Sequence, residues 1–149
     1  MQKSYLALGC FWKPEETFRQ LTGVIETEVG YAGGTSSSTN YEEVCTGNTG
    51  HTETIKIMYD EKIISYERLL EVFFETHDPT QKDMQYPDVG TQYRSEIFYE
   101  NEQQKNTAEK YKNLFNEKLN GKIETNISKI KNYCKAEDYH QKYIMKKNQ

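Results

Sequence analysis

The chain has 149 residues, of which 35% are hydrophobic, 13% aromatic and 28% charged, and its formal net charge is −4. This length suits one domain, 1–149, with one core, and a mildly acidic surface of mixed sign gives no electrostatic reason to bind nucleic acid or an anionic membrane. No segment approaches the roughly 20 apolar residues of a membrane span, and the N-terminus is too polar for a signal peptide, so we expect a cytoplasmic protein.

The first part of the chain predicts a strand, a helix and two further strands. Residues 4–8 are a short apolar run that leads into Gly9. Pro14 and the two acids after it begin a helix, which Gly23 ends. Residues 24–31 and 51–60 alternate in polarity as strands do, and a loop rich in Gly, Ser and Thr over 33–40 lies between them.

The second part of the chain predicts two longer helices and two strands. Ser65 is the expected N-cap of a helix that ends at His77, because Pro79 follows closely. Residues 80–92 are a polar loop and 94–99 a strand. Asn101 with Gln104 resembles a capping box in front of a long amphipathic helix. Residues 123–127 predict a last strand, and an irregular polar tail follows from residue 133.

This order of elements is typical of an α+β fold with a ferredoxin-like split βαβ core, in which two helices pack on an antiparallel or mixed sheet. Two irregular loops, over 30–50 and 78–94, are longer than such a core needs. Loops of that length in a compact domain are usually functional. Both loops flank the strands that carry the polar and aromatic residues considered next.

Cys10 is the first candidate functional residue, because it lies between a strand and the first turn of a helix. Free backbone amides and the positive end of the helix dipole favour a thiolate at such a position. Gly9 adds no side chain that could block the sulfur. A buried and inert cysteine at a strand end would explain this segment equally well.

Other polar residues recur at the ends of the predicted strands. Tyr31 precedes a pair of glycines that tolerate positive φ, so its ring can turn inward. Glu53 opens the third strand, and Asp88 and Tyr93 close the second long loop. Taken one at a time, each of these residues has an ordinary structural explanation. A tyrosine is usually part of the core, a glutamate usually lies on the surface, and an aspartate before glycine usually belongs to a turn.

Six sequence strings occur in this order along the chain: GCFW, GYAGG, YEEVCTGNTGHTE, HDP, GTQYRS and AEDYHQ. Together, from Gly9 to about Tyr143, they resemble the A-type peptide methionine sulfoxide reductases. One such string would be weak, whereas six in register are a strong signal. The resemblance implies thiol-dependent reduction of methionine-S-sulfoxide to methionine, free or in oxidised proteins, through a sulfenic acid at Cys10.

The resemblance also implies a role for each matching residue. Cys10 matches the nucleophile of the family, and Glu53 matches its general acid. Tyr31 and Tyr93 match two phenols that help hold the sulfoxide oxygen. Phe11 and Trp12 match the aromatic wall around the S-methyl group of the substrate. Asp88 matches an acid that helps fix the substrate.

The chemistry gives independent sense to these residue types. A sulfoxide sulfur is a poor electrophile until its oxygen is protonated, so a thiolate must be paired with a hydrogen-bonded acid. Glu53 can be that acid only if it is protonated, and partial burial beside Tyr31 and Tyr93 raises a carboxyl pKa in the required direction. An uncharged methyl group needs an apolar cage, which Phe11 and Trp12 can supply.

Regeneration of the sulfenic acid requires a second thiol. Many relatives carry resolving cysteines in a Gly-rich C-terminal tail, which has no counterpart here. We expect Cys45 to be buried and structural. Cys134 stands where relatives commonly have an aromatic residue, so it is either a resolving cysteine or a small core replacement.

An external reductant such as thioredoxin, glutaredoxin or glutathione is expected in any case, with no cofactor or metal, and the chain is expected to act as a monomer. Lys13 replaces a glycine usual in the family, and its charge either favours the thiolate or simply faces solvent.

Other classes of function remain open at the level of sequence. A zinc site would need cysteines and histidines at tight spacings, which His51, His77 and His140 do not provide. A Cys–His hydrolase would pair Cys10 with one of these histidines as the base. We instead expect His140 to give structural support near the site. A non-enzymatic ferredoxin-like module would use its Tyr and Phe side chains as ligand platforms.

Overall fold

The computed structural model describes residues 1–148. In this part of the chain, a six-stranded sheet has the order β7-β6-β1-β3-β2-β8. Its four central strands are β1 (Gln2–Leu8), β2 (Val24–Ala32), β3 (Thr52–Tyr59) and β6 (Ser95–Tyr99). β1 is antiparallel to both β3 and β6, and β2 is antiparallel to β3. This arrangement confirms the predicted ferredoxin-like order.

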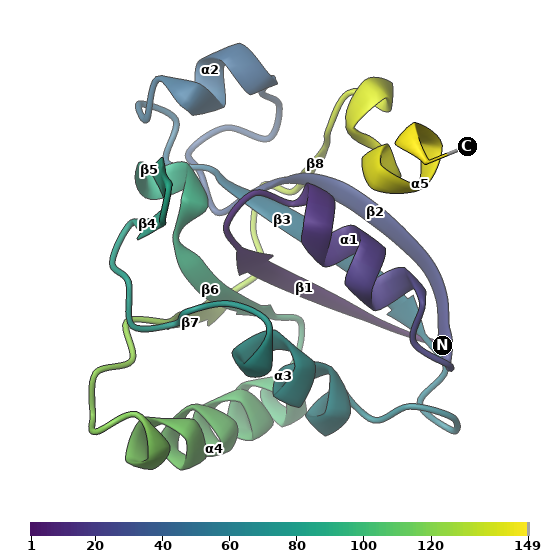
Figure 1. Ribbon diagram of the computed structural model, residues 1–149, viewed down its shortest axis with the longest axis vertical. Coiled ribbons are helices and arrows are strands. Elements are labelled where there is room, and N and C mark those ends of the chain that lie inside the picture. Colours follow the sequence, from purple (N-terminus) through teal and green to yellow (C-terminus); the bar gives the residue numbers. More distant parts are fainter. Residues whose placement is uncertain (149) are drawn as a thin grey trace.

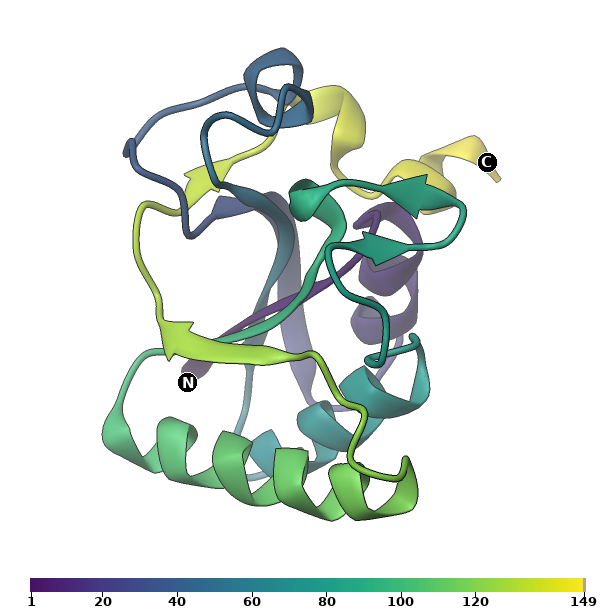
Figure 2. The same ribbon diagram turned by 90° about the vertical axis from the view of Figure 1, so that its left-hand side faces the viewer.

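Three helices cover one face of the sheet. In Figure 1, α1 (Trp12–Arg19) lies in front of the strands, while α3 (Tyr66–Glu75) and α4 (Glu102–Lys118) lie below them. Figure 2 shows α4 running alongside α3 at the base of the molecule. Side chains from the strands and helices interlock in the main core, where the following are fully buried: Leu6, Ile55, Ile97, Phe18 and Leu69.

Local signals set the ends of α3 as the sequence predicts. The hydroxyl of Ser65 accepts a hydrogen bond from the backbone N–H of Arg68 at 3.1 Å, which caps the helix. Beyond its last turn, the His77 ring contacts the carbonyl oxygen of Phe73 at 2.6 Å and the hydroxyl of Ser95 at 2.8 Å. Burial lowers the pKa of His77 to about 4, so this ring is a neutral link between α3 and β6.

The register of three strands brings residues from distant parts of the chain to one face of the sheet. Glu53 of β3 pairs with Tyr31 of β2, and Tyr31 pairs with Cys134 of β8 (Cys134–Lys135). Directly paired residues project their side chains to the same face. β8 can approach because residue 30 is glycine: a Cβ there would lie 2.5 Å from the carbonyl oxygen of Cys134.

Short elements outside the core differ from the prediction. The loops contain α2 (Tyr41–Cys45), the hairpin of β4 (Met84–Gln85) and β5 (Asp88–Val89), and the 3₁₀ helix η1 (Thr91–Tyr93). β7 (Asn126–Lys129), parallel to β6, begins three residues later than expected. The tail is not irregular, since β8 is followed by η2 (Asp138–His140) and α5 (Tyr143–Lys147). These elements are too short for a periodic pattern, and contacts with distant residues hold them.

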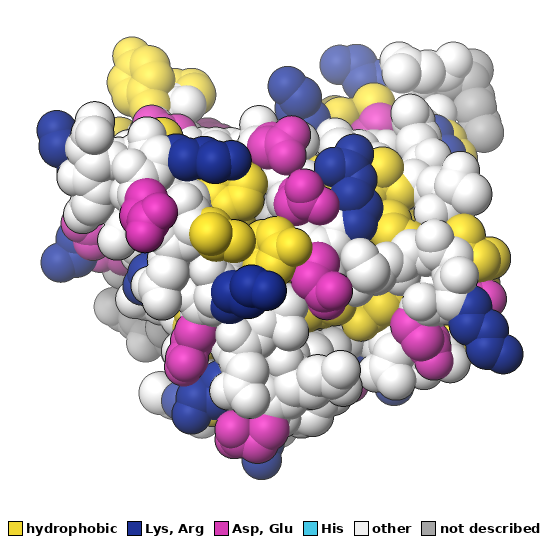
Figure 3. Space-filling view, turned by 90° about the horizontal axis from the view of Figure 1, so that it is seen from below, with side chains coloured by type: hydrophobic (Ala, Val, Ile, Leu, Met, Phe, Trp, Pro, Cys, Tyr) yellow, Lys and Arg dark blue, Asp and Glu magenta, His cyan; other side chains and the backbone are white. Residues whose placement is uncertain are grey.

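The face of the molecule over α3 and α4 carries charges of both signs (Figure 3). Figure 3 views the molecule from the side of α3 and α4, where acidic and basic side chains are interspersed with hydrophobic ones. Among residues 1–148, every helix is too short or too polar to reach across a bilayer.

Candidate active site

Cys10 lies where β1 passes into α1, as the sequence predicts, and its side chain is half-buried. Gly9, immediately before it, has a φ of +91°, a conformation that glycine adopts without strain. A Cβ on Gly9 would lie 2.7 Å from Cγ of Gln85 in β4. Glycine at this position therefore allows both the sharp turn and the close approach of Gln85, in the β4–β5 hairpin, to the residue before Cys10.

Glu53 is held directly beside this turn. Its side chain is 2% exposed, and Oε1 accepts a hydrogen bond from the backbone N–H of Phe11 at 3.1 Å. Burial raises the pKa of Glu53 to about 8, and the charge of Asp88 acts in the same direction, while the Phe11 amide opposes both. The expected rise in pKa is therefore found, and Glu53 is mostly protonated at pH 7.

The thiol of Cys10 behaves differently from the prediction. Burial, with a smaller contribution from the charges of Glu53 and Asp88, raises its pKa to about 11. The backbone N–H of Trp12 faces the sulfur and favours the thiolate, but it is outweighed. The start of the helix thus favours the thiolate as expected, but burial and the two carboxyl groups outweigh it in the free protein, and Lys13 is exposed.

The two predicted phenols occupy different surroundings. Tyr31 is fully buried, and its hydroxyl donates a hydrogen bond to Oε1 of Glu137 at 2.8 Å. Tyr93 is half-buried beside Glu53, Tyr41 and Asp88, and burial raises its pKa. Both phenols keep their protons at neutral pH, but only Tyr31 has that proton committed to a carboxylate.

Glu137 was not predicted as a site residue. Its second oxygen accepts the backbone N–H of Tyr41 at 2.9 Å, so one carboxyl group joins the buried phenol to the start of α2. Burial alone would raise the pKa of Glu137, but hydrogen bonds from the Tyr41 amide and the Tyr31 phenol bring it below its usual value. The AEDYHQ string contains Glu137, yet sequence alone gave no reason to choose it.

The aromatic wall is present next to Cys10. Phe11 is 2% exposed and packs against Tyr31 with ring centroids 5.7 Å apart. The indole N–H of Trp12 donates to Nδ1 of His140 at 3.0 Å, which confirms His140 as structural support near the site. Tyr143 of α5 stacks on Trp12, with ring centroids 3.8 Å apart and planes 8° apart. Tyr143 was missed because the tail was read as irregular.

The loop after β5 is tied to β3 by polar contacts. The hydroxyl of Thr52 donates to the carbonyl oxygen of Gln92 at 2.9 Å, which places the neighbouring Tyr93 next to Glu53. Arg94 donates to the carbonyl oxygen of Gly50 at 3.0 Å and pairs with Glu96 at 2.7 Å. These contacts fix both long loops at one end of the sheet.

The remaining cysteines and histidines give no second reactive centre. Cys45 is exposed, so the prediction of a buried structural cysteine is wrong. Cys134 is half-buried, and its thiol points to the carbonyl oxygen of Thr39 at 3.6 Å. His51 is 1% exposed, far too buried to serve as a base at a substrate site.

The described residues also show no alternative centre. No hydrogen bond within 1–148 joins the Cys10 sulfur to a histidine, and that range contains no cluster of three or more His, Cys, Asp or Glu side chains able to hold a metal ion.

The arrangement therefore combines a thiol, a protonated carboxyl group and an apolar aromatic wall at one end of the sheet. A protonated acid beside a nucleophile can protonate a leaving or accepting oxygen as the sulfur attacks. A Cys–His hydrolase would need an imidazole at the sulfur, and the three histidines are engaged or buried elsewhere.

Comparison with known proteins identifies close relatives. The family model described as peptide methionine sulfoxide reductase matches residues 2–149. The peptide methionine sulfoxide reductase MsrA of Pelagibacter ubique is 55% identical over 147 residues, covering 99% of this chain and all of that protein.

Solved structures agree with this assignment. The crystal structure of reduced Mxr1 from Saccharomyces cerevisiae superposes with a TM-score of 0.94 at 38% identity, covering 99% of this chain and 86% of that one. Mxr1 in complex with Trx2 gives a TM-score of 0.68 at 27% identity, over 95% of this chain and 84% of that one.

Proposed function

The chain belongs to the peptide methionine sulfoxide reductase family, and we propose that Cys10 is its nucleophile and Glu53 its general acid. The protein is an oxidoreductase that returns methionine sulfoxide to methionine with electrons from thiols. The residue assignment rests on the buried Glu53 carboxyl group. This group accepts a hydrogen bond from the backbone N–H of Phe11, the residue after Cys10, and is mostly protonated at neutral pH.

In the reductive step, the Cys10 thiolate attacks the sulfoxide while Glu53 gives its proton to the sulfoxide oxygen. The sulfur–oxygen bond of the substrate breaks, and the oxygen becomes bonded to the Cys10 sulfur. Methionine leaves in reduced form and Cys10 is oxidised to a sulfenic acid. The thiol releases its proton to solvent before the attack, and Glu53 takes a proton from solvent after the oxygen transfer, so the carboxyl group is ready for the next cycle.

The other site residues bind and orient the substrate in this proposal. Tyr93 donates its phenol proton to the sulfoxide oxygen, because the proton of Tyr31 is already committed to Glu137. Tyr31 supports the floor of the site, whereas Phe11 and Trp12 enclose the S-methyl group. Asp88 keeps the local charge negative, which maintains the proton on Glu53. The preference for the S epimer at sulfur is carried over from the family resemblance.

A thiol reductant then regenerates Cys10, and a thioredoxin-type protein fits this role because Mxr1 has been crystallised with Trx2. Cys10 and Cys134 are both free thiols, and the Cys134 thiol points to the carbonyl oxygen of Thr39 at 3.6 Å. A disulfide would need the two sulfurs to meet with Cα atoms within about 7 Å, so we favour direct attack of the external thiol on the sulfenic acid. The three free thiols suit a reducing compartment such as the cytoplasm.

Steady-state reduction of the two sulfoxide epimers of N-acetylmethionine, with a thioredoxin system as electron source, tests the proposal. We expect turnover of the S epimer and none by Cys10→Ser. Cys45→Ser is the matched control for loss of a thiol, since Cys45 is exposed and its side chain bonds to Tyr41 rather than to Glu53. Full activity in Cys10→Ser, or loss of activity in Cys45→Ser alone, would contradict the assignment.

A further inference from the structure

One buried carboxyl group near the active site has no part in the reaction. Glu15, in the first turn of α1, is 1% exposed. Its Oε2 accepts the hydroxyl of Thr27 at 2.8 Å, and its Oε1 accepts the backbone N–H of Lys142 at 2.6 Å. A buried carboxyl group is costly unless its oxygens are bonded, and here both are occupied. One of these bonds joins α1 to the C-terminal segment, 127 residues away in sequence.

Lys142 lies at the turn between η2 and α5. Its φ of 51° and ψ of 42° place it in the left-handed region, where a non-glycine residue is uncommon. The residues around it are those that contact Trp12: His140 accepts the indole N–H, and Tyr143 stacks on the ring. The Glu15 bond thus fixes the turn between the two groups that hold Trp12.

Trp12 and Glu15 are three residues apart on α1, so they lie on the same face of the helix. The C-terminal segment therefore meets α1 through two adjacent side chains. An indole that is hydrogen-bonded at its N–H and stacked on one face has little freedom to rotate. The position of the Trp12 ring depends on where this segment is anchored.

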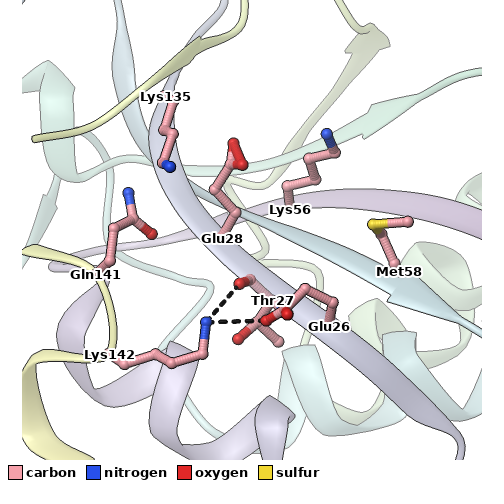
Figure 4. Close-up of a pocket in the computed structure, with 8 residues that line it drawn as sticks. All are labelled: Glu26, Thr27, Glu28, Lys56, Met58, Lys135, Gln141 and Lys142. Atoms are coloured by element: carbon pink, nitrogen blue, oxygen red, sulfur yellow. Dashed lines mark hydrogen bonds and ion pairs between the residues drawn. The ribbon is translucent and has the colours of Figure 1, made fainter. Parts of the chain in front are cut away.

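Further contacts hold the segment along the free edge of β2. The Lys142 ammonium donates to the carbonyl oxygen of Thr27 at 3.1 Å and pairs with Glu26 at 2.9 Å, as Figure 4 shows at a cavity of about 260 Å³. The side-chain amide of Gln141 accepts a hydrogen bond from the backbone N–H of Val29 at 2.9 Å and donates one to the carbonyl oxygen of Val29 at 2.8 Å. These contacts align the segment along the strand, whereas Glu15 ties it to the helix that carries Trp12, through the Lys142 amide and through the Lys142 ammonium at 3.9 Å.

We propose that Glu15 is a positioning residue that sets the width of the methyl pocket through the Lys142 amide, Tyr143 and Trp12. The inference rests on the proposed function, in which Trp12 encloses the S-methyl group. Glu15 itself touches neither the substrate nor Cys10. Without this anchor, the segment shifts, Tyr143 leaves the indole, and the pocket admits a larger alkyl group.

Substrate selectivity tests the proposal, with N-acetylmethionine sulfoxide and N-acetylethionine sulfoxide as probes. An apolar pocket discriminates one methylene by about 10- to 200-fold, so we expect Glu15→Ala to reduce the ratio of the two kcat/KM values about tenfold. The KM for the methyl substrate should rise more than kcat falls. Glu15→Gln keeps an acceptor for the Lys142 amide and should retain most of the selectivity.

Trp12 is the only tryptophan of the chain, so its fluorescence reports on this position without any turnover. We expect a red-shifted emission and faster quenching by acrylamide in Glu15→Ala, and a near wild-type spectrum in Glu15→Gln. A wild type that reduces neither sulfoxide would defeat the proposed function. The emission comparison would still show whether Glu15 positions Trp12.

Two matched controls separate positioning from general damage to the helices. Glu16→Ala removes the neighbouring carboxyl group of α1, which pairs with Arg19 at 2.7 Å on the surface. Lys147→Ala changes an exposed side chain of α5 itself. Both controls should keep the selectivity and the emission of the wild type.

A second pair of variants decides the matter if Glu15→Ala does not fold. Tyr143→Ala removes the stacked ring, whereas Tyr143→Phe keeps it, so only the alanine variant should lose selectivity. Unchanged selectivity in Glu15→Ala would overturn the proposal even if the emission shifted. If Glu15→Ala is unfolded, unchanged selectivity in Tyr143→Ala would overturn it instead.

Discussion

Replacement of Glu53 by glutamine tests the acid–base pair most sharply. Glutamine keeps an oxygen that can accept the Phe11 amide, but it has no proton to give. A positioned general acid contributes about 10²- to 10⁴-fold to rate, so we expect the second-order rate constant for oxidation of Cys10 at pH 7 to fall by that factor.

The pH dependence of this rate follows from the two pKa values. The reactive form of the pair carries one proton, on Glu53, with Cys10 as thiolate, and the pKa values are about 8 and about 11. Below pH 8 the pair holds two protons, so the wild-type rate constant rises with pH, and it levels between the two values. From pH 7 to pH 10 it should rise about tenfold. Glu53→Gln is limited only by the thiolate fraction and should rise by roughly 100- to 1000-fold, because loss of the Glu53 charge also lowers the thiol pKa somewhat.

Rapid-quench measurement of methionine formed in a single turnover, without reductant, gives both profiles. Asp83→Asn is a matched control that removes a carboxyl group from the second long loop without changing the Glu53 hydrogen bond. Parallel pH profiles for wild type and Glu53→Gln, or an unchanged rate at pH 7, would remove Glu53 from the acid role.

Three further predictions concern the thiols and phenols. Alkylation of Cys10 by iodoacetamide should accelerate about tenfold per pH unit up to about pH 11, because only the thiolate reacts; a plateau near pH 6 in the free protein would contradict the raised pKa. Tyr93→Phe should slow the reductive step more than Tyr31→Phe does. The main effect of Tyr31→Phe should be a loss of about 1.5–3 kcal/mol in the free energy of unfolding, because the hydrogen bond to Glu137 is lost. The reverse order of rates in stopped-flow experiments would reassign the two phenols. Cys134→Ser should leave thioredoxin-supported turnover unchanged, and accumulation of sulfenic acid in that variant would give Cys134 the resolving role.

The sequence predicts the central fold well because its signals there are local. The caps at Ser65 and Asn101 act within three residues, and both are found, with the Asn101 side chain accepting the Gln104 amide at 2.9 Å. Each alternating strand and each amphipathic helix has one apolar face that must be buried against the others. Because connections are short, the order of these elements along the chain is compatible with only a few sheet topologies.

The missed parts depend on contacts between distant residues. β8 contains two residues and exists because Gly30 lets it approach β2, which no periodicity reveals. Glu15, Glu137 and Tyr143 each have a decisive partner more than 90 residues away. The strand pairing that brings these partners together is not readable from any one segment.

The candidate site was predictable in its residue types but not in its charge states. The resemblance named Cys10 and Glu53, and the structure brings Glu53 to the residue after Cys10. The raised thiol pKa was missed because the helix start was weighed without the burial and the two carboxyl groups that oppose it. A local rule for thiolates fails where longer-range terms are larger.

Mass spectrometry of the chain after one turnover without reductant tests the central claim most directly. With methionine sulfoxide in excess and dimedone present as a sulfenic acid trap, the account predicts one equivalent of methionine per chain and a dimedone adduct on the peptide that carries Cys10. An unmodified Cys10 beside a full equivalent of methionine would contradict it.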